Sequence, residues 1–210
     1  HGLPALVKRS LAEGLSGLEF LAGIPGTLGA ALRMNAGGRY GCIGTRVSAV
    51  SGYELDGRPF RLSAPECRFR YRDSGLDNLL VTKCELAPLT PGRGDRSRYR
   101  RILEEKRSSQ PLAGRSAGCV FKNPEGPGLP PAGRLIEELG FKGHRVGGAR
   151  VSARHANFLL CEGNARARDV LELIHRIRQR AWRERGVRLE LEIALWGLSE
   201  EELGPPEAAA

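Results

Sequence analysis

The sequence predicts a mixed α+β fold, because helical and strand-like patterns follow one another irregularly along its 210 residues. The first half is rich in strand signals around a hairpin turn, and the second half holds the clearest amphipathic helix. Hydrophobic residues make up 40% of the chain and charged residues 27%, which are ordinary values for a globular protein. A chain of this length has room for one large domain or two small ones, each with its own core.

In the N-terminal half, we expect β-structure after one short helix. The helix covers residues 3–13, where an apolar stripe is followed by Gly14. The next stretch, residues 17–44, is dense in glycine, which indicates backbone packed closely against another group rather than a regular helix or strand. Further on, Asp56-Gly57 is a strong hairpin signal. The strands expected around and after this turn cover residues 47–55, 60–62 and 79–86.

The C-terminal half combines helices with shorter apolar segments. A loop rich in proline and glycine, residues 88–97, leads into a basic helix at residues 97–107, and we expect a domain junction there. The longest amphipathic helix covers residues 165–185 and is followed by Gly186. The remaining elements expected are a short helix around residues 135–139 and strands at residues 145–152, 157–161 and 187–195.

The net charge of +9 indicates a surface that attracts anions, whether nucleic acid, acidic lipid or a phosphate-rich small molecule. No apolar run approaches the roughly 20 residues of a membrane span, so we expect no membrane-spanning helix. Five cysteines, without CxxC spacing, argue against a disulfide framework and a zinc site and favour a reducing cytosol. The four histidines lack metal-ligand spacing, and we expect no metal site. Because the chain begins at His1 rather than Met, we expect its natural start to be missing.

Two motifs in the N-terminal half could bind a ligand. In GLEFLAGIPGTLGAALRMNAGGRYG, residues 17–41, glycines would let the backbone approach a ligand, and its amides could hold a pyrophosphate. This pattern is neither a dinucleotide-binding fingerprint nor a P-loop, and a packing role is the alternative. In FRYRDS, residues 69–74, an extended backbone would project Arg70 and Arg72 to one face, where they could hold a carboxylate or phosphate. A solvated basic strand is the alternative there.

Two motifs in the C-terminal half could carry chemistry. In SAGCVFKNP, residues 116–124, small neighbours leave the Cys119 thiol accessible, so it could act as a nucleophile or a proton donor. Lys122 and Asn123 supply a cation and an amide nearby, although a lone cysteine is more often a small buried apolar residue. In LELEIALWG, the alternation of a strand would place Glu192 on the face opposite the apolar residues, where a solvated glutamate is the alternative.

Taken in this order, the four motifs resemble those of the UDP-N-acetylenolpyruvoylglucosamine reductase family, flavoenzymes of peptidoglycan precursor synthesis. GLEFLAGIPGT followed by RMNAG is similar to its flavin-contacting segment, FRYRDS to its YRxS motif, and SAGCVFKNP to its SAGSVFKNP motif. AGRLIEELGFKG, GGARVSARHANF and the glutamate of LELEI extend the resemblance over nearly the whole chain. The chain departs from the usual pattern at Cys161, where the family has an asparagine, and in LELEI, where LEPEV is commoner. Little sequence separates Leu86 from SAGCVFKNP, which indicates the shorter subclass.

The resemblance implies an oxidoreductase that uses FAD and NADPH. Hydride from flavin N5 would reduce the enolpyruvyl double bond of UDP-N-acetylglucosamine enolpyruvate, and a proton would complete UDP-N-acetylmuramate. By their motif positions, Arg72 would stabilise the developing enolate, Cys119 would donate the proton, and Glu192, with a raised pKa, would donate a hydrogen bond or orient a water. Lys122 and Asn123 would contact the substrate. The implied flavin-binding residues are Gly23, Ile24, Pro25, Gly26, Thr27, Gly29, Asn35, Ala36, Gly37 and Gly41.

The resemblance also implies a domain organisation. Residues 1–110 would be the C-terminal part of a FAD-binding domain of the vanillyl-alcohol-oxidase (PCMH) type, with its N-terminal portion missing. Residues 111–197 would form a smaller α+β substrate-binding domain, and residues 198–210 a tail. We expect a cytoplasmic enzyme, a monomer rather than an oligomer, whose partner is a UDP-sugar and not a nucleic acid or a membrane.

Three alternatives remain open at this point. Another flavoprotein of the same FAD-binding fold would carry a covalent flavin on His or Cys but gives no reason for SAGCVFKNP. A basic nucleic-acid-binding module fits the charge, but aromatic residues are only 6% of the chain and no RNP, KH or helix-turn-helix pattern is present. A truncated chain without catalytic activity is the third alternative, since the family's N-terminal flavin loop is absent from this sequence.

Overall fold

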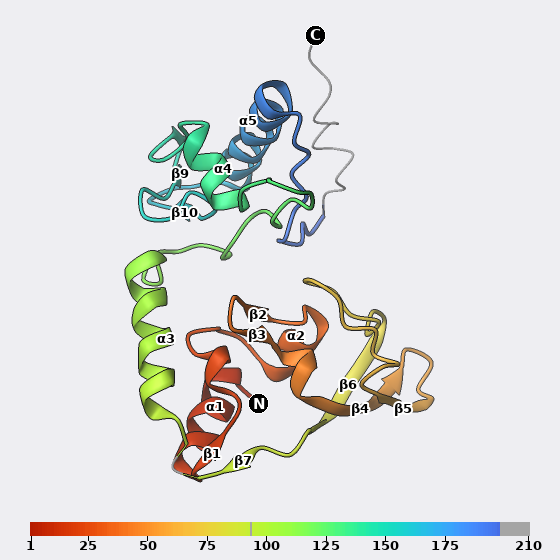
Figure 1. The fold of residues 1–210 in the computed structure, drawn as a ribbon. Helices are drawn as coiled ribbons and strands as arrows, with labels where there is room; N and C mark the ends of the chain where they lie inside the picture. Colours follow the sequence, from red (N-terminus) through yellow and green to blue (C-terminus); the bar gives the residue numbers. More distant parts are fainter. Residues whose placement is uncertain (93, 198–210) are drawn as a thin grey trace. The chain divides into compact units, whose positions relative to one another are not determined.

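The computed structural model describes residues 1–92 and 94–197, and the chain divides into two compact units, His1–Lys106 and Arg107–Ala210. We call them unit 1 and unit 2 (Figure 1). Each unit has its own cluster of buried apolar side chains and contains both helices and strands. The predicted α+β class is therefore confirmed. The tail predicted at residues 198–210 lies outside the described residues.

Unit 1 is organised around a three-stranded antiparallel sheet in the order β5-β4-β6. The central strand β4 (Val47–Glu54) pairs with β5 (Pro59–Ser63) across the predicted hairpin turn and with β6 (Leu79–Leu86) on its other side. Gly57 in that turn has a φ of +87°, which a glycine adopts without strain. The three predicted strands are confirmed, with shifts of at most one residue at their ends.

Helix α1 (Leu3–Ala12) also matches the sequence prediction. Proline lies in its first turn, and its apolar stripe, represented by Val7, is buried in the core of unit 1. The backbone leaves the helix at Gly14, where φ is +74°. Each of these features acts locally, which explains why the sequence alone could place the helix.

The glycine-dense stretch is more regular than the sequence predicts. It contains the 3-10 helices η1 (Glu19–Leu21) and η2 (Ile43–Arg46) and the short hairpin of β2 (Gly37–Gly38) and β3 (Gly41–Cys42). It also contains an α-helix, α2 (Leu28–Arg33), so the prediction of no regular helix or strand was wrong. Helix α2 forms because the Thr27 hydroxyl caps it, accepting a hydrogen bond of 3.2 Å from the amide of Ala30.

The predicted loop at residues 88–97 is also partly regular. It contains the short strand β7 (Thr90–Pro91), which pairs with β1 (Leu15–Ser16). Helix α3 (Arg96–Ser109) then begins one residue earlier than predicted and buries Ile102. None of the helices within residues 1–92 and 94–197 combines the length and the apolar character needed to cross a bilayer.

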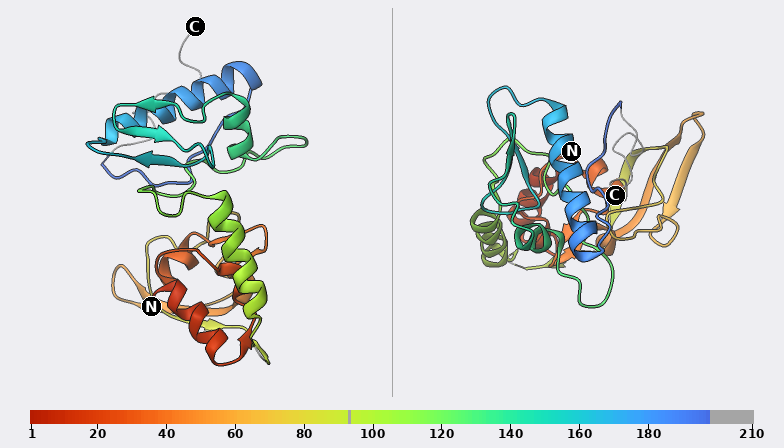
Figure 2. Two further views of the ribbon diagram at one scale, coloured as in Figure 1. Left: turned by 90° about the vertical axis from the view of Figure 1, so that its left-hand side faces the viewer. Right: turned by 90° about the horizontal axis from the view of Figure 1, so that it is seen from above.

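Unit 2 contains a small antiparallel sheet in the order β10-β9-β8 and two helices, α4 and α5, which contact each other. Helix α5 lies against β8 and β9 (Figures 1 and 2) and confirms the predicted long helix. The chain leaves α5 at Gly186, whose φ is +62°. The bounds of these elements are α4 (Ala132–Glu138), β8 (Arg145–Val146), β9 (Ala149–Val151), β10 (Leu159–Cys161) and α5 (Ala167–Arg185).

The strand predictions in unit 2 need correction. The continuous strand expected at residues 145–152 is a tight hairpin, because the backbone turns at Gly147, where φ is +50°. The strand expected at residues 157–161 is limited to its last three residues, β10.

The strand expected at residues 187–195 is also wrong. Among the described residues, this segment is paired through an isolated bridge between Leu191 and Phe121 rather than through a continuous ladder. The predicted alternation nevertheless holds at Val187, Leu189 and Leu191, which are buried.

Candidate functional site

The arginine motif of unit 1 is a tight turn, so the prediction of an extended segment was wrong. The amide of Arg70 donates to the carbonyl of Asp73 at 3.0 Å, and the amide of Asp73 donates back at 3.3 Å. The guanidinium of Arg70 also pairs with the Asp73 carboxylate at 2.8 Å. Arg72 has a φ of +54°, a left-handed conformation that a strand excludes. Arg70 and Arg72 therefore do not share one strand face.

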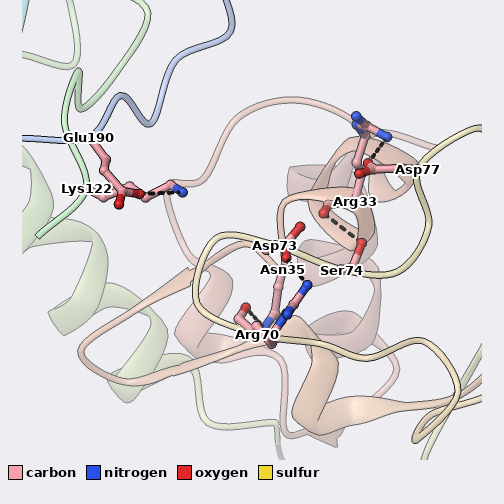
Figure 3. A network of polar contacts seen from close by, with 8 residues as sticks. All are labelled: Arg33, Asn35, Arg70, Asp73, Ser74, Asp77, Lys122 and Glu190. Atoms are coloured by element: carbon pink, nitrogen blue, oxygen red, sulfur yellow. Dashed lines mark hydrogen bonds and ion pairs between the residues drawn. The ribbon is translucent and has the colours of Figure 1, made fainter. Parts of the chain in front are cut away.

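Asn35 joins this turn to the glycine-rich segment. Its side-chain amide donates to the carbonyl of Arg70 at 2.7 Å, and its oxygen accepts from the amide of Gly44 at 2.9 Å. Ser74 adds a second connection by donating to the carbonyl of Arg33 at 2.8 Å. Figure 3 shows this contact and the contact of Asn35 with Arg70. Asn35 is only 4% exposed. The structure thus brings two of the predicted motifs together, with Asn35 holding the backbone of both.

The predicted flavin residues differ in how closely other atoms surround them. Gly37 serves the fold, because a side chain there would clash with the backbone of the facing strand β3. Gly23 also packs closely, since an added Cβ would lie 3.2 Å from the side chain of Lys106. At Gly26 and Gly29, by contrast, an added Cβ would meet no atom within 4 Å. The remaining residues of this set are exposed at Pro25 and Thr27 and half-buried at Ile24, Ala36 and Gly41.

One edge of this segment is already paired with other backbone. The amide of Leu3 donates to the carbonyl of Gly26, and the amide of Leu28 donates to the carbonyl of His1, both at 2.9 Å. The first residues of the chain therefore fix the course of the glycine-rich segment. The open positions Gly26 and Gly29 lie on either side of Thr27 and Leu28.

In unit 2, the structure brings Cys119 and Glu192 onto neighbouring extended segments. The amide of Glu192 donates to the carbonyl of Val120 at 2.8 Å, directly beside Cys119 along the chain. The amide of Lys122 donates to the carbonyl of Glu190 at 2.9 Å, which continues the same pairing. Cys119 and Glu192 are both half-buried. This arrangement can place a thiol and a carboxyl group near one another on a surface that a ligand can reach.

The two predicted substrate contacts have different surroundings. The side-chain oxygen of Asn123 accepts a hydrogen bond of 3.0 Å from the amide of Ala132, at the start of α4. Asn123 therefore has a structural role in anchoring that helix. The ammonium of Lys122 forms an ion pair of 3.3 Å with the carboxylate of Glu190 (Figure 3).

Comparisons with known proteins agree with these motifs. Residues 110–196 match the family model described as UDP-N-acetylenolpyruvoylglucosamine reductase, C-terminal domain. The UDP-N-acetylenolpyruvoylglucosamine reductase of Moorella thermoacetica is 47% identical over 197 residues, which cover 93% of this chain and 64% of that protein. UDP-N-acetylenolpyruvoylglucosamine reductase 2 of Symbiobacterium thermophilum is 44% identical over 200 residues, with 93% and 63% covered.

A solved structure decides the family. The crystal structure of UDP-N-acetylenolpyruvylglucosamine reductase (MurB) from Thermus caldophilus is similar with a TM-score of 0.79 and 42% identity, covering 93% of this chain and 70% of that one. The chain belongs to the UDP-N-acetylenolpyruvoylglucosamine reductase family. It spans 64% and 63% of the lengths of the Moorella and Symbiobacterium reductases, which is less than two thirds of each.

The sequence motifs did not reveal Asn157, whose side chain holds the backbone of the segment around Phe121 in this reductase-family chain. Asn157 is 3% exposed, and its amide group contacts the backbone of Phe121 twice. The nitrogen donates to the carbonyl of Phe121 at 2.8 Å, and the oxygen accepts from the amide of Phe121 at 2.9 Å. Asn157 thereby holds the segment that carries Cys119 and Lys122. The available signal was the polar residue inside the HANF motif, next to apolar strand residues.

Lys106 is the second residue that the motifs did not reveal. Its ammonium donates to the carbonyl of Ala22 at 2.6 Å, immediately before Gly23. Burial lowers the pKa of Lys106 to about 8, and the positive charge of Arg72 lowers it further in the same direction. A lysine from α3 thus lies beside the glycine-rich segment and within electrostatic range of the arginine turn.

The pKa of Lys106 predicts how the stability of unit 1 varies with pH. Between pH 8 and 10.5 the folded unit releases the Lys106 proton while the unfolded chain still binds it, so the free energy of unfolding should rise with pH. We expect Lys106 to contribute a rise of about 1–3 kcal/mol, with the lower figure reflecting partial screening by solvent.

The measurement is urea unfolding of the wild type and of Lys106→Met at several pH values from 7 to 11. The difference in the free energy of unfolding between the two proteins should change across this pH range. Lys8→Met, on the exposed face of α1, is the matched control and should show no such change. A difference between wild type and Lys106→Met that is constant over the range would contradict the lowered pKa.

None of the five cysteines, all within the described residues, forms a disulfide. Burial raises the pKa of Cys84 to about 11, and Cys67 and Glu85 add to the effect. Burial also raises the pKa of Cys67. Both thiols are therefore poor nucleophiles near neutral pH.

Among residues 1–92 and 94–197, no group of three or more His, Cys, Asp or Glu side chains could hold a metal ion.

Proposed function

We propose that this chain acts as an NADPH-driven, FAD-dependent reductase of UDP-N-acetylglucosamine enolpyruvate, giving UDP-N-acetylmuramate for peptidoglycan synthesis in the cytoplasm. Its relatives carry the corresponding reductase name. The observation that carries the proposal is the set of motif residues Arg72, Cys119 and Glu192, present in order in a chain of this family. Arg72 belongs to unit 1, and Cys119 and Glu192 belong to unit 2.

The domain roles follow from the same proposal. We assign residues 1–110 to the C-terminal part of a FAD-binding domain of the vanillyl-alcohol-oxidase type, and residues 111–197 to a substrate-binding domain. The open positions at Gly26 and Gly29 support a flavin contact, because backbone without side chains allows a ring or a pyrophosphate to approach closely. Gly23 to Gly29 would hold FAD, which when bound supplies the hydride.

Arg72 would stabilise the charge that develops in the transition state. Hydride addition to the end of the alkene moves negative charge onto the carbon that bears the carboxylate, so an enolate-like group forms. A guanidinium at that position stabilises the charge, provided it is held in place before the reaction. The Arg70–Asp73 turn and its hydrogen bond to Asn35 support such positioning, because they fix the backbone on both sides of Arg72.

Cys119 would complete the reaction as general acid. The reduction adds one hydride and one proton across the double bond, and the proton would pass from the thiol to the carbon next to the carboxylate. The resulting thiolate would recover its proton from solvent. Glu192, on the neighbouring segment, would donate a hydrogen bond to the developing enolate when protonated, or orient a water molecule. Lys122 and Asn123 would contact the UDP-sugar.

The test is a visible absorption spectrum of the full 210-residue chain after incubation with FAD and desalting under anaerobic conditions. We expect a yellow protein that NADPH bleaches and that UDP-N-acetylglucosamine enolpyruvate restores. UDP-N-acetylglucosamine, which has no double bond to reduce, is the matched control and should leave the protein bleached. A flavin that NADPH reduces but the enolpyruvate does not reoxidise would refute the substrate assignment. A chain that retains no FAD would refute the flavin assignment for residues 1–110.

A further inference from the structure

A cavity in unit 2 is lined mainly by positively charged side chains. Its volume is about 300 Å³, which lies at the lower end of the range for pockets that bind small molecules. No step of the proposed reaction uses this cavity as a whole. The lining residues are Lys122, Arg178, Arg188, Glu190 and Leu191.

Arg178 is the unusual member of this set. It is only 7% exposed, and its Nε and Nη1 atoms have no hydrogen-bond partner among the described residues. Its neighbours on α5 behave differently: Arg176 and Arg180 are exposed and pair with glutamates four residues away, at 2.6 and 2.7 Å. A buried guanidinium that lacks a counterion destabilises a protein, and an anion bound beside it removes that penalty. An anion bound beside Arg178 would therefore reduce the free-energy penalty of its buried charge.

The other charges of the cavity favour the same kind of ligand. Lys122 and Arg188 add two cations to that of Arg178, while Glu190 is the one carboxylate in the lining. With all four groups ionised, the lining carries a net charge of +2. The Glu190 side chain is 69% exposed and pairs with Lys122 rather than with Arg178. A compact ligand with two or more negative charges matches this arrangement best.

We propose that this cavity is an oxyanion-binding site that takes a phosphate or diphosphate group, held mainly by Arg178. Lys122 and Arg188 supply further positive charge, and Glu190 competes with the ligand for Lys122. The bound group is either a free inorganic anion or the phosphate portion of a nucleotide. Binding of an anion here does not require FAD, because the lining residues are all in unit 2. Lys122 alone is shared with the substrate contacts of the proposed function.

The primary test is isothermal titration calorimetry of the full chain with inorganic pyrophosphate, in buffer free of other multivalent anions. We expect one pyrophosphate per chain. Arg178→Met should weaken this binding by about 30-fold or more, since it removes a buried partner of the ligand. Arg176→Met removes the same charge from an exposed position of the same helix and should change the affinity by less than about threefold. Without pyrophosphate, Arg178→Met should be at least as stable as the wild type.

A second variant keeps the test decisive if Arg178→Met fails to fold. Glu190→Gln removes the competing carboxylate at an exposed position, and we expect it to tighten pyrophosphate binding by about two- to fivefold. The proposal is overturned if the wild type does not bind 10 mM pyrophosphate, or if Arg178→Met binds as the wild type does. An unchanged or weakened affinity in Glu190→Gln also overturns it.

Competition identifies the source of the bound group. UDP-N-acetylglucosamine that displaces pyrophosphate in proportion to its concentration would assign the site to the phosphates of a nucleotide. Simultaneous binding of both ligands would assign it to a free anion. If the wild-type chain binds pyrophosphate but does not reduce UDP-N-acetylglucosamine enolpyruvate, the result counts against the proposed function and supports the anion site.

Discussion

Replacing Cys119 with alanine should slow reduction of the enolpyruvyl substrate by about 10²- to 10⁴-fold, the range expected when a general acid is removed. Reduction of FAD by NADPH should remain close to normal, because that half-reaction needs no proton from the thiol. Stopped-flow absorbance of the FAD-loaded protein measures both half-reactions separately, first the bleaching by NADPH and then the return of colour with substrate. Equal losses in the two half-reactions would rule out the proton-donor role.

Two variants define what the Cys119 result means. Cys119→Ser keeps a donor at the same position, and the resemblance to SAGSVFKNP leads us to expect that it recovers most of the lost rate. Cys161→Ala removes a half-buried thiol from β10 in the same unit and should leave both half-reactions unchanged. If Cys161→Ala reproduces the defect, the loss follows from general damage to unit 2 and not from the absence of an acid.

Replacing Asn157 with alanine should destabilise unit 2 by about 2–5 kcal/mol. The change leaves the amide and the carbonyl of Phe121 without partners in a residue that is only 1% exposed, and each such buried group costs about 1–3 kcal/mol. In a unit of this size the expected fall in the unfolding midpoint is more than about 8 °C. Thermal and urea unfolding followed by circular dichroism provide the measurement.

Asn164→Ala is the control for this prediction. Asn164 is exposed in the loop before α5, so its replacement should change the stability by less than about 0.5 kcal/mol. A loss at Asn157 no larger than that at Asn164 would mean that the two contacts with Phe121 do not contribute to stability. Because the same contacts hold the segment next to Cys119, Asn157→Ala should also slow the substrate half-reaction.

The elements that the sequence predicted are those whose causes are local. Helix α5 has an apolar stripe along its whole length and a left-handed glycine at its end, and both features can be recognised in a single segment. The β4–β5 hairpin is likewise specified by its own turn residues, Asp56 and Gly57. The segment at residues 187–195 also alternates, but it forms an isolated bridge between Leu191 and Phe121 and not a strand, which its own residues do not reveal.

The errors in the candidate site have non-local causes. FRYRDS alternates aromatic and basic residues as a strand would, yet it forms a turn that is tied to Asn35, 35 positions earlier in the chain. The roles of Asn157 and Arg178 are equally hidden, since each depends on which distant backbone or side chain faces it. The sequence could therefore identify the residues of the motifs but not the polar contacts that hold them.

Asn35 also makes the glycine-rich segment and the arginine turn thermodynamically interdependent. One amide group fixes the backbone at both Arg70 and Gly44, so neither segment can change its conformation without breaking a hydrogen bond to the other. A ligand that orders one segment thus lowers the entropy cost of ordering its neighbour, and the effect is equal in the reverse direction. A substrate that engages Arg72 would then bind more tightly once the glycine-rich segment is occupied, although the two ligands need not touch.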